Sequence, residues 1–312
     1  MDSIYEKRPW LKNYPDWAPH DLDLTSETAL GDFKKSAALN PEAPAIYYFD
    51  HEISCGKVDR LSDQLAVAFE NLGLKKGERI ILDLQNVPQF PIAAYAAWKI
   101  GAIVVPLNPM YKEKELAYFC RDSGARLFLT LDEIASNLDL SFLEHTSIEK
   151  VITTSPLDFL PLGADPPDIL KRPRKIAVPG AMDMLEMIEA FQGKTPNEPG
   201  IAPEDVAYLT YTSGTTGPPK GAMNTHGNIA FNARVYQAMQ RIDSHDVVLG
   251  VAPLFHVTGE VAHLAIAALA GIPLVLYYRF DPGETLHLIE RWKVTVTVAS
   301  ITAYIALLNH PD

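Results

Sequence analysis

The sequence predicts an α/β protein made of two similar α/β subdomains that face each other. Three observations support this prediction. Short apolar runs typical of buried strands alternate with amphipathic helical patterns along most of the chain. The chain has 312 residues, which is long for a single hydrophobic core. A weak internal repeat also relates positions that lie 170 residues apart.

In the first part of the chain, helix and strand patterns follow one another with short turns between them. Ser54 precedes an apolar-periodic stretch and is a favourable N-cap, and Gly124 is suited to end a helix. Such alternation is typical of parallel sheets covered by helices. The predicted elements are helix 55–71, strand 79–84, helix 90–100, strand 102–106, helix 112–123, strand 126–130 and a strand near Val151.

A proline-rich stretch, residues 156–203, surrounds one helical piece at 182–191 and indicates a boundary. We therefore assign residues 1–200 to a first α/β subdomain with an N-terminal extension and a proline-rich linker, and residues 201–312 to a second unit. The elements predicted for this second unit are strand 205–212, a polar loop, an extended piece at 221–224, a helix opening at Thr225, strand 247–251, helix 257–270 and strand 272–276.

The internal repeat appears when the chain is shifted by 170 positions. Gly101 then falls on Gly271 and Arg121 falls on Arg291, and both copies read helix, glycine, strand, helix, strand. General α/β patterning is the alternative explanation, because the match is one of residue class more than of identity. A real duplication predicts two subdomains with the same order of elements.

The charge balance indicates small-molecule ligands. The formal net charge is -12, whereas proteins that bind nucleic acids usually present a basic face, so we expect no nucleic-acid partner. Only Cys55 and Cys120 are present, which gives neither a disulfide framework nor a metal-ligand spacing. The N-terminus carries charges where a signal peptide needs an apolar run, so we expect a cytoplasmic protein.

One uncharged stretch, residues 261–278, is about as long as the minimum for crossing a bilayer. His263, Gly271 and Pro273 divide this stretch, so we interpret it as a buried helix, a glycine turn and a strand. We therefore expect no transmembrane segment, and peripheral contact with a membrane surface is left open.

The segment 211–221, YTSGTTGPPKG, is too rich in glycine and proline for a helix and too polar for a core strand. It lies where the two subdomains meet, and ligands commonly bind in such crevices. Glycines let the backbone approach an anion, hydroxyl groups add donors and the lysine adds a positive charge. The residues expected to bind a polyphosphate are Thr212, Ser213, Gly214, Thr215, Thr216, Gly217 and Lys220.

This segment is not a Walker loop, because Lys220 is followed by Gly221 where that motif needs serine or threonine at the start of a helix. A flexible linker between domains is the alternative interpretation, but it leaves the lysine and the tight composition unexplained.

The stretch YTSGTTGPPKGAM at 211–223 resembles the phosphate-loop signature of the adenylate-forming, AMP-binding enzymes, which include acyl-CoA synthetases, luciferases and peptide-synthetase adenylation domains. AAWKIGAIVVPLNPMY at 96–111, APLFHVTG at 252–259 and ALLNHPD at 306–312 are also similar to that family. The N-terminal RPWLKNYPDWAPHDLDL is similar to long-chain fatty-acid CoA ligases in particular.

The resemblance implies a ligase that converts a fatty acid into an acyl-adenylate with ATP and then transfers the acyl group to the thiol of coenzyme A. It implies that the phosphate loop, with Lys220 and Thr216 as catalytic donors, stabilises the departing pyrophosphate together with Mg²⁺. His256 matches a family position beside the acyl and adenylate pocket; a core or helix-cap histidine is the alternative. Val257, Thr258 and Gly259 are candidates for contact with the acyl group.

The resemblance also implies what is missing. The family pattern continues with a Thr-Glu pair, a ribose-binding aspartate, an arginine and a C-terminal domain with an essential lysine, and none of these occurs in this sequence. We therefore expect the second subdomain to be incomplete, with no C-terminal domain, and these 312 residues alone to bind ATP weakly and to form no acyl-CoA.

Two functions remain open at this point. The first is the front part of a fatty acyl-CoA ligase, and the second is a truncated protein that binds nucleotide or acyl groups without catalysis. Aryl acids such as hydroxycinnamates remain alternatives to fatty acids, because part of the acid pocket comes from residues that this sequence lacks. The sequence does not determine the oligomeric state.

Overall fold

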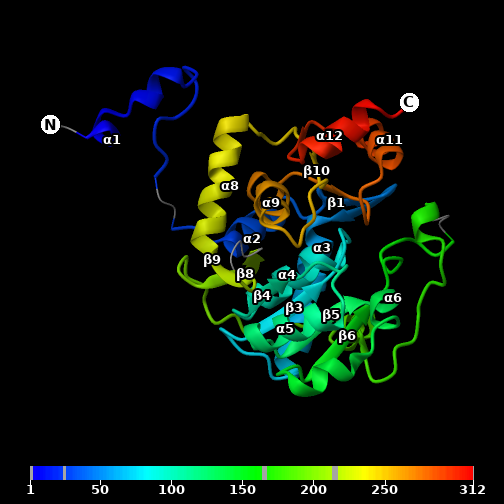
Figure 1. The fold of residues 1–312 in the computed structure, drawn as a ribbon. Coiled ribbons are helices and arrows are strands. Elements are labelled where there is room, and N and C mark those ends of the chain that lie inside the picture. The colour runs from blue at the N-terminus through cyan, green and yellow to red at the C-terminus, as the bar shows by residue number, and fades with distance from the viewer. Residues whose placement is uncertain (1–2, 24–25, 164–166, 213–216, 312) are drawn as a thin grey trace.

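The computed structural model describes residues 3–23, 26–163, 167–212 and 217–311. Within these ranges the fold is mixed α/β, and the strands form two sheets, with strand orders β7-β6-β5-β3-β4-β8-β9 and β12-β10-β11-β1-β2. Figure 1 shows the first sheet, with β3 to β6, in the lower half of the molecule and β1, β10, α11 and α12 in the upper half. The predicted fold class is confirmed.

The same order of elements occurs twice along the chain: a β-hairpin, a helix, and then three parallel strands separated by helices. The first copy comprises β1 (Pro44–Tyr48), β2 (His51–Ser54), α3 (Cys55–Asn71), β3 (Arg79–Asp83), α4 (Gln89–Lys99), β4 (Ile103–Pro106), α5 (Glu113–Ser123) and β5 (Leu127–Leu131).

The second copy begins with the hairpin that carries the predicted phosphate loop. It comprises β8 (Val206–Thr212), β9 (Lys220–Thr225), α8 (His226–Gln240), β10 (Val248–Leu249), α9 (Val257–Gly259), the π-helical turn η4 (Glu260–Ala265), α10 (Ile266–Ala270), β11 (Leu274–Leu276), α11 (Pro282–Trp292) and β12 (Val296–Thr297). The predicted repeat therefore agrees with the order of elements in the structure.

Each hairpin completes the sheet of the other copy. Strand β8 pairs in parallel with β4, through Tyr208 and Val104, while β1 pairs in parallel with β11, through Ile46 and Leu274. The order β5-β3-β4-β8-β9 in the first sheet therefore corresponds, strand by strand, to the order β12-β10-β11-β1-β2 in the second. The boundary predicted near residue 200 does not separate the sheets, because the chain crosses between them twice.

Other elements lie outside the duplicated units. Strands β6 and β7 extend the first sheet beyond β5, while α2 contacts α3, α8 and α10. The N-terminal α1 lies away from the body of the molecule (Figure 1). These elements are α1 (Ile4–Lys7), η1 (Pro9–Asn13), α2 (Ala29–Leu39), α6 (Asp132–Ala135), η2 (Leu140–His145), β6 (Lys150–Thr154), η3 (Asp168–Leu170), β7 (Met182–Asp183), α7 (Met184–Ala190) and α12 (Ile301–Leu308).

Local sequence explains why corresponding elements begin and end at corresponding places. Ser54 and Thr225 each end the second strand of a hairpin and cap the next helix, accepting a hydrogen bond from the backbone N–H three residues on. Gly101 and Gly271 adopt positive φ values of 73° and 65° in the turns that lead into β4 and β11. The predicted helix 257–270 is interrupted by the π-helical turn, which the apolar pattern does not signal.

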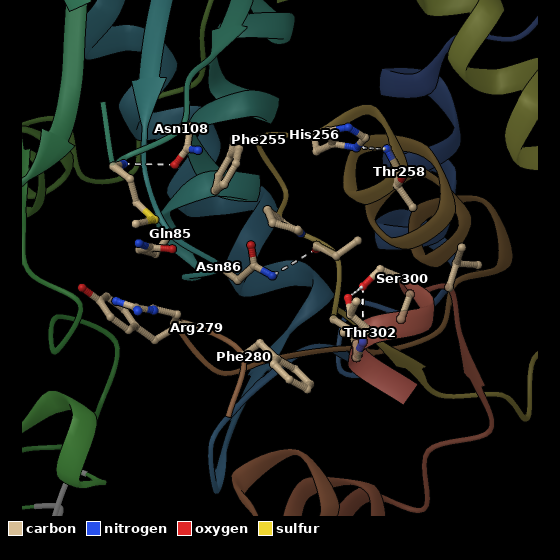
Figure 2. A pocket seen from close by; sticks show the side chains of 18 residues that line it. Gln85, Asn86, Asn108, Phe255, His256, Thr258, Arg279, Phe280, Ser300 and Thr302 are labelled. Atoms are coloured by element: carbon tan, nitrogen blue, oxygen red, sulfur yellow. Dashed lines mark hydrogen bonds between the residues drawn. The ribbon is translucent and has the colours of Figure 1, made fainter. Parts of the chain in front are cut away.

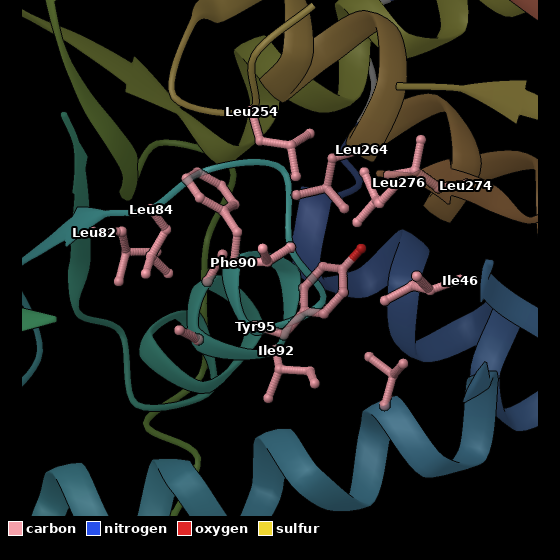
Figure 3. Close-up of a cluster of buried hydrophobic side chains, with 14 of the residues drawn as sticks. Ile46, Leu82, Leu84, Phe90, Ile92, Tyr95, Leu254, Leu264, Leu274 and Leu276 are labelled. Atoms are coloured by element: carbon pink, nitrogen blue, oxygen red, sulfur yellow. The ribbon is translucent and has the colours of Figure 1, made fainter. Parts of the chain in front are cut away.

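One hydrophobic core joins the two halves. Helix α4 is buried along its whole length, and its Phe90 and Tyr95 lie in a cluster with Leu254, Leu264 and Leu276 from the second half (Figure 3). Burial of such side chains from both halves contributes about 25 cal/mol for each Å² removed from water. No described helix is long and apolar enough to cross a membrane. Most side chains of the stretch at 261–278 are buried in the core.

Asn86 ties the two sheets together at the ends of their parallel strands. Its backbone exchanges two hydrogen bonds with Tyr278, of 3.0 and 2.9 Å. Its buried side chain donates to the carbonyls of Gly250 and Ala252, at 2.9 and 3.2 Å, and accepts from the backbone N–H of Leu254 at 2.8 Å. This single side chain therefore fixes the course of the segment that leads to His256.

We expect Asn86→Ala to lower the free energy of unfolding by about 2–4 kcal/mol, since it removes the hydrogen-bond partner of one buried carbonyl, one partly buried carbonyl and one buried N–H. Urea denaturation monitored by tryptophan fluorescence measures this loss. Gln85→Ala is the matched control, because Gln85 lies beside Asn86 and is half-buried. Equal losses in the two variants would contradict the role given to Asn86.

Candidate active site

The larger candidate cavity, of about 690 Å³, lies at the carboxyl ends of parallel strands from both sheets. Its walls come from segments that directly follow β3, β4, β10, β11 and β12, and Figure 2 shows them converging. In α/β proteins ligands bind in such a crevice. The lining residues are Gln85, Asn86, Asn108, Met110, Val251, Ala252, Pro253, Phe255, His256, Thr258, Tyr278, Arg279, Phe280, Val298, Ala299, Ser300, Thr302 and Ala303.

A second cavity, of about 500 Å³, adjoins the first beside the predicted phosphate loop. The two cavities share Asn108, Phe255 and His256. The second is lined by Pro106, Leu107, Asn108, Tyr111, Thr210, Tyr211, Thr212, Ala222, Asn224, Phe255, His256 and Val257. Together they offer a divided site whose two parts meet at a histidine.

Among the described residues, no carboxylate lines either cavity, although the protein carries a net charge of -12. The formally charged group that lines them is the guanidinium of Arg279, and His256 is the titratable imidazole. Negative side chains would repel a phosphate or a carboxylate in such a space. Walls without carboxylates therefore suit an anionic ligand.

The predicted phosphate loop joins the two strands of the hairpin. Thr212 ends β8 and pairs with Lys220 at the start of β9, and the Thr212 hydroxyl lies 3.4 Å from the Lys220 carbonyl. The Tyr118 hydroxyl donates to the carbonyl of Pro219 at 2.7 Å and so anchors the loop's return to α5. Lys220 and Gly217 are exposed, while Thr212 lines the smaller cavity.

Four of the predicted phosphate-binding residues, Ser213, Gly214, Thr215 and Thr216, lie outside the described residues. The structure brings together Thr212 and Lys220 through the strand pair, and it places His256 on the wall shared by both cavities.

His256 is the N-cap of α9, and its Nδ1 accepts a 3.3 Å hydrogen bond from the backbone N–H of Thr258. An accepting Nδ1 in a neutral ring leaves the proton on Nε2, which can donate to a ligand. The capping alternative and the site role are therefore compatible, since the same ring caps the helix and faces both cavities.

The three residues after His256 face different surroundings. Val257 lines the smaller cavity and Thr258 lines the larger. Gly259 is buried, and a Cβ added there would lie 2.1 Å from the carbonyl oxygen of Pro253. A larger residue at Gly259 would therefore displace the backbone beside His256, so we assign this glycine to close packing.

Glu260 is a buried carboxyl group that sequence reasoning missed. It has no exposed surface, and its two oxygens lie 2.9 and 3.1 Å from the hydroxyl of Thr210, which also accepts from Asn224 at 3.3 Å. Burial raises the pKa of Glu260 to about 8. The sequence signal was a single acid directly before the uncharged stretch, and nothing local reveals that its partner lies 50 residues earlier.

The described residues hold no group of three histidine, cysteine, aspartate or glutamate side chains arranged for a metal ion. The cavity walls that the structure describes offer hydroxyl, amide and imidazole groups in place of carboxylates. These residues do not by themselves fit the Mg²⁺ ion that the sequence resemblance implies.

Comparison with known proteins identifies the family. Residues 33–312 match the model of the AMP-binding enzyme family, and the chain belongs to this family. It is 34% identical to a long-chain-fatty-acid–CoA ligase of Bacillus subtilis over 99% of this chain and 56% of that protein. It is 30% identical to 4-coumarate–CoA ligase 2 of rice, Oryza sativa subsp. japonica, over 93% of this chain and 51% of that protein.

Solved structures share the fold. A long-chain-fatty-acid-CoA ligase from Archaeoglobus fulgidus aligns with a TM-score of 0.77 at 24% identity, over 95% of this chain and 56% of that one. A benzoate CoA ligase from Burkholderia xenovorans LB400 also aligns with a TM-score of 0.77, at 20% identity, over 92% of this chain and 53% of that one. The chain thus spans little more than half the length of these relatives.

Glu260→Gln should remove part of the loss of stability at alkaline pH. The folded protein keeps the Glu260 proton up to about pH 8, whereas the unfolded chain releases it near pH 4.3, so unfolding is favoured as pH rises between these values. One such group changes the free energy of unfolding by at most about 1.4 kcal/mol per pH unit.

Chemical denaturation at pH 5 and pH 8.5 measures this effect. We expect the glutamine variant to lose less stability than wild type over this interval, while Glu290→Gln, at an exposed carboxyl, keeps the wild-type slope. Parallel slopes for all three proteins would rule out the neutral buried state of Glu260.

Proposed function

We propose that this chain forms the nucleotide- and acid-binding part of an ATP-dependent acyl-CoA ligase that activates a fatty acid. The carrying observation is the pair of carboxylate-free cavities that meet at His256, beside the hairpin with the phosphate-loop sequence. Family membership supports this chemistry, and the Bacillus subtilis relative supports a long-chain acid.

In the proposed reaction, a carboxylate oxygen of the acid attacks the α-phosphorus of ATP. The bond from that phosphorus to the bridging oxygen breaks, and pyrophosphate leaves. The thiol of coenzyme A, after losing its proton, then attacks the acyl carbon and AMP leaves, which gives the thioester. We assign no step to Mg²⁺, because the described cavity walls do not by themselves fit this ion.

This chain's part in the first step is electrostatic. The Lys220 ammonium is exposed and has no ion pair within the described ranges, so it is free to bind the departing pyrophosphate. Thr212 and the loop hydroxyls, including that of Thr216, would add donors. His256, with a proton on Nε2, would donate to the phosphate or acyl oxygen held between the two cavities.

Aryl acids are a second candidate substrate class. The rice relative is named a 4-coumarate–CoA ligase, and the cavity walls contain aromatic rings at Phe255, Tyr111 and Phe280 that would stack on a planar acid. The fatty-acid proposal rests on the long-chain ligases among the more similar relatives. We further propose a cytoplasmic location, with ATP, coenzyme A and the acid as small-molecule partners.

Lys220→Ala should slow adenylate formation by about 10²-fold or more in a catalytically competent polypeptide that contains these residues, since it removes one charged donor to the leaving pyrophosphate. ATP–pyrophosphate exchange measures this step. Lys114→Ala is the control, because that lysine is also exposed and lies on α5 outside both cavities. Exchange within a few-fold of wild type would remove Lys220 from this role.

Direct competition between acids tests the substrate class. Palmitate, 4-coumarate and benzoate should be titrated against the 312-residue chain with a fluorescent fatty-acid probe. We expect palmitate to displace the probe at least about tenfold better than the aryl acids, because each buried methylene adds about 0.8 kcal/mol. Stronger displacement by 4-coumarate would favour the aryl-acid candidate.

A further inference from the structure

We propose that Arg279 is the anchor for a phosphate group of a nucleotide bound in the larger cavity. The guanidinium of Arg279 is exposed at this cavity and forms no hydrogen bond or ion pair with any residue that the structure describes. Figure 2 places it on the same side of the cavity as Gln85, across from Ser300 and Thr302. Arginine binds phosphate oxygens in a two-pronged geometry that a lysine does not reproduce.

Arg279 stays unpaired because the neighbouring carboxylates are already engaged. Asp281, two residues further on, caps α11 and accepts from the backbone N–H of Glu284 at 2.9 Å. Glu133 binds the Tyr278 hydroxyl and also pairs with Arg172 at 2.9 Å. Both acids are therefore satisfied without Arg279.

The backbone that presents Arg279 is held in an uncommon conformation. Tyr278 has a φ of 64°, which is unfavourable for a residue with a side chain and occurs mainly where the surroundings enforce it. Two hydrogen bonds with the backbone of Asn86 and the contact with Glu133 enforce it here. A fixed backbone reduces the entropy that Arg279 loses when it binds a ligand.

The rest of the larger cavity fits a nucleotide. Its volume of about 690 Å³ is within the usual range for cofactor sites. The side chains of Phe255 and Phe280 supply apolar surface for a base, and Ser300 and Thr302 supply hydroxyl groups for a ribose. The absence of carboxylates from the described walls leaves Arg279 unopposed as the cation that attracts phosphate.

Two nucleotides of the proposed reaction carry the required chemistry, ATP and coenzyme A. The choice of these ligands rests on the proposed function, whereas the anchor itself rests on the geometry of Arg279. The binding experiment therefore uses both nucleotides and two further probes. Adenosine has no phosphate, and the anionic group of palmitate is a carboxylate instead of a phosphate.

The dissociation constants of the four probes should be measured by NMR titration for the full chain, Arg279→Gln and Arg279→Lys. We expect Arg279→Gln to weaken the binding of ATP or of coenzyme A by about tenfold or more, while adenosine binds as it does to wild type. The affinity of Arg279→Lys for that nucleotide should lie between the affinities of wild type and Arg279→Gln. The nucleotide that loses affinity identifies the source of the phosphate.

Arg121→Gln is the matched control, since Arg121 is exposed on α5, outside the cavity, and should bind all probes as wild type does. Unchanged nucleotide binding by Arg279→Gln, an equal loss for adenosine, or a loss confined to palmitate would each overturn the phosphate anchor. Lys220→Ala should be titrated in the same way. If wild type binds the nucleotides and Lys220→Ala is the only variant with weaker nucleotide binding, the proposed function stands without this anchor. Failure of wild type to bind either nucleotide would contradict both.

Discussion

The exchange of hairpins between the two sheets is the constraint on which the rest of the structure depends. Strand β8 must pair with β4 and strand β1 with β11 before either sheet is complete. Neither half can therefore bury its core without the other, and the two sheets are held with the carboxyl ends of their parallel strands facing one crevice. The phosphate-loop hairpin completes the first sheet, because β8 pairs with β4, and the chain then continues through α8 into the second sheet. The hairpin therefore lies where the two halves meet.

Charge is arranged around this crevice by engaging carboxylates elsewhere. Asp59 and Asp63 bind the buried Lys99, both at 2.6 Å, which fastens α3 to α4. Such a buried cation stabilises the fold only while its partners are kept. Glu133 is paired in the same manner, and burial keeps Glu260 protonated at neutral pH. An acidic protein can thus have cavities whose described walls carry a guanidinium and no carboxylate.

Much of the fold follows from local sequence, and the parts that did not follow depend on long-range contacts. The helices at 55–71 and 112–123 were predicted to within a residue, because caps and turn glycines mark helix ends. The boundary predicted near residue 200 rests on proline content, which reports a change in local structure and not which strands pair. In the candidate site, the motif indicated Lys220 and His256, whose roles stay predictions, whereas Asn86 and Arg279 carry no sequence signal because they line the cavity only where the two sheets meet.

The start of the helix after His256 shows why the two halves of the site should act together. Gly259 allows this helix to touch the carbonyl of Pro253, and Glu260 binds Thr210 of strand β8. The first contact fixes the turn that contains His256, and the second joins that turn to the hairpin that carries Lys220. Because a close-packed interior transmits strain, a displacement of the hairpin would be transmitted through Glu260 to the turn that contains His256.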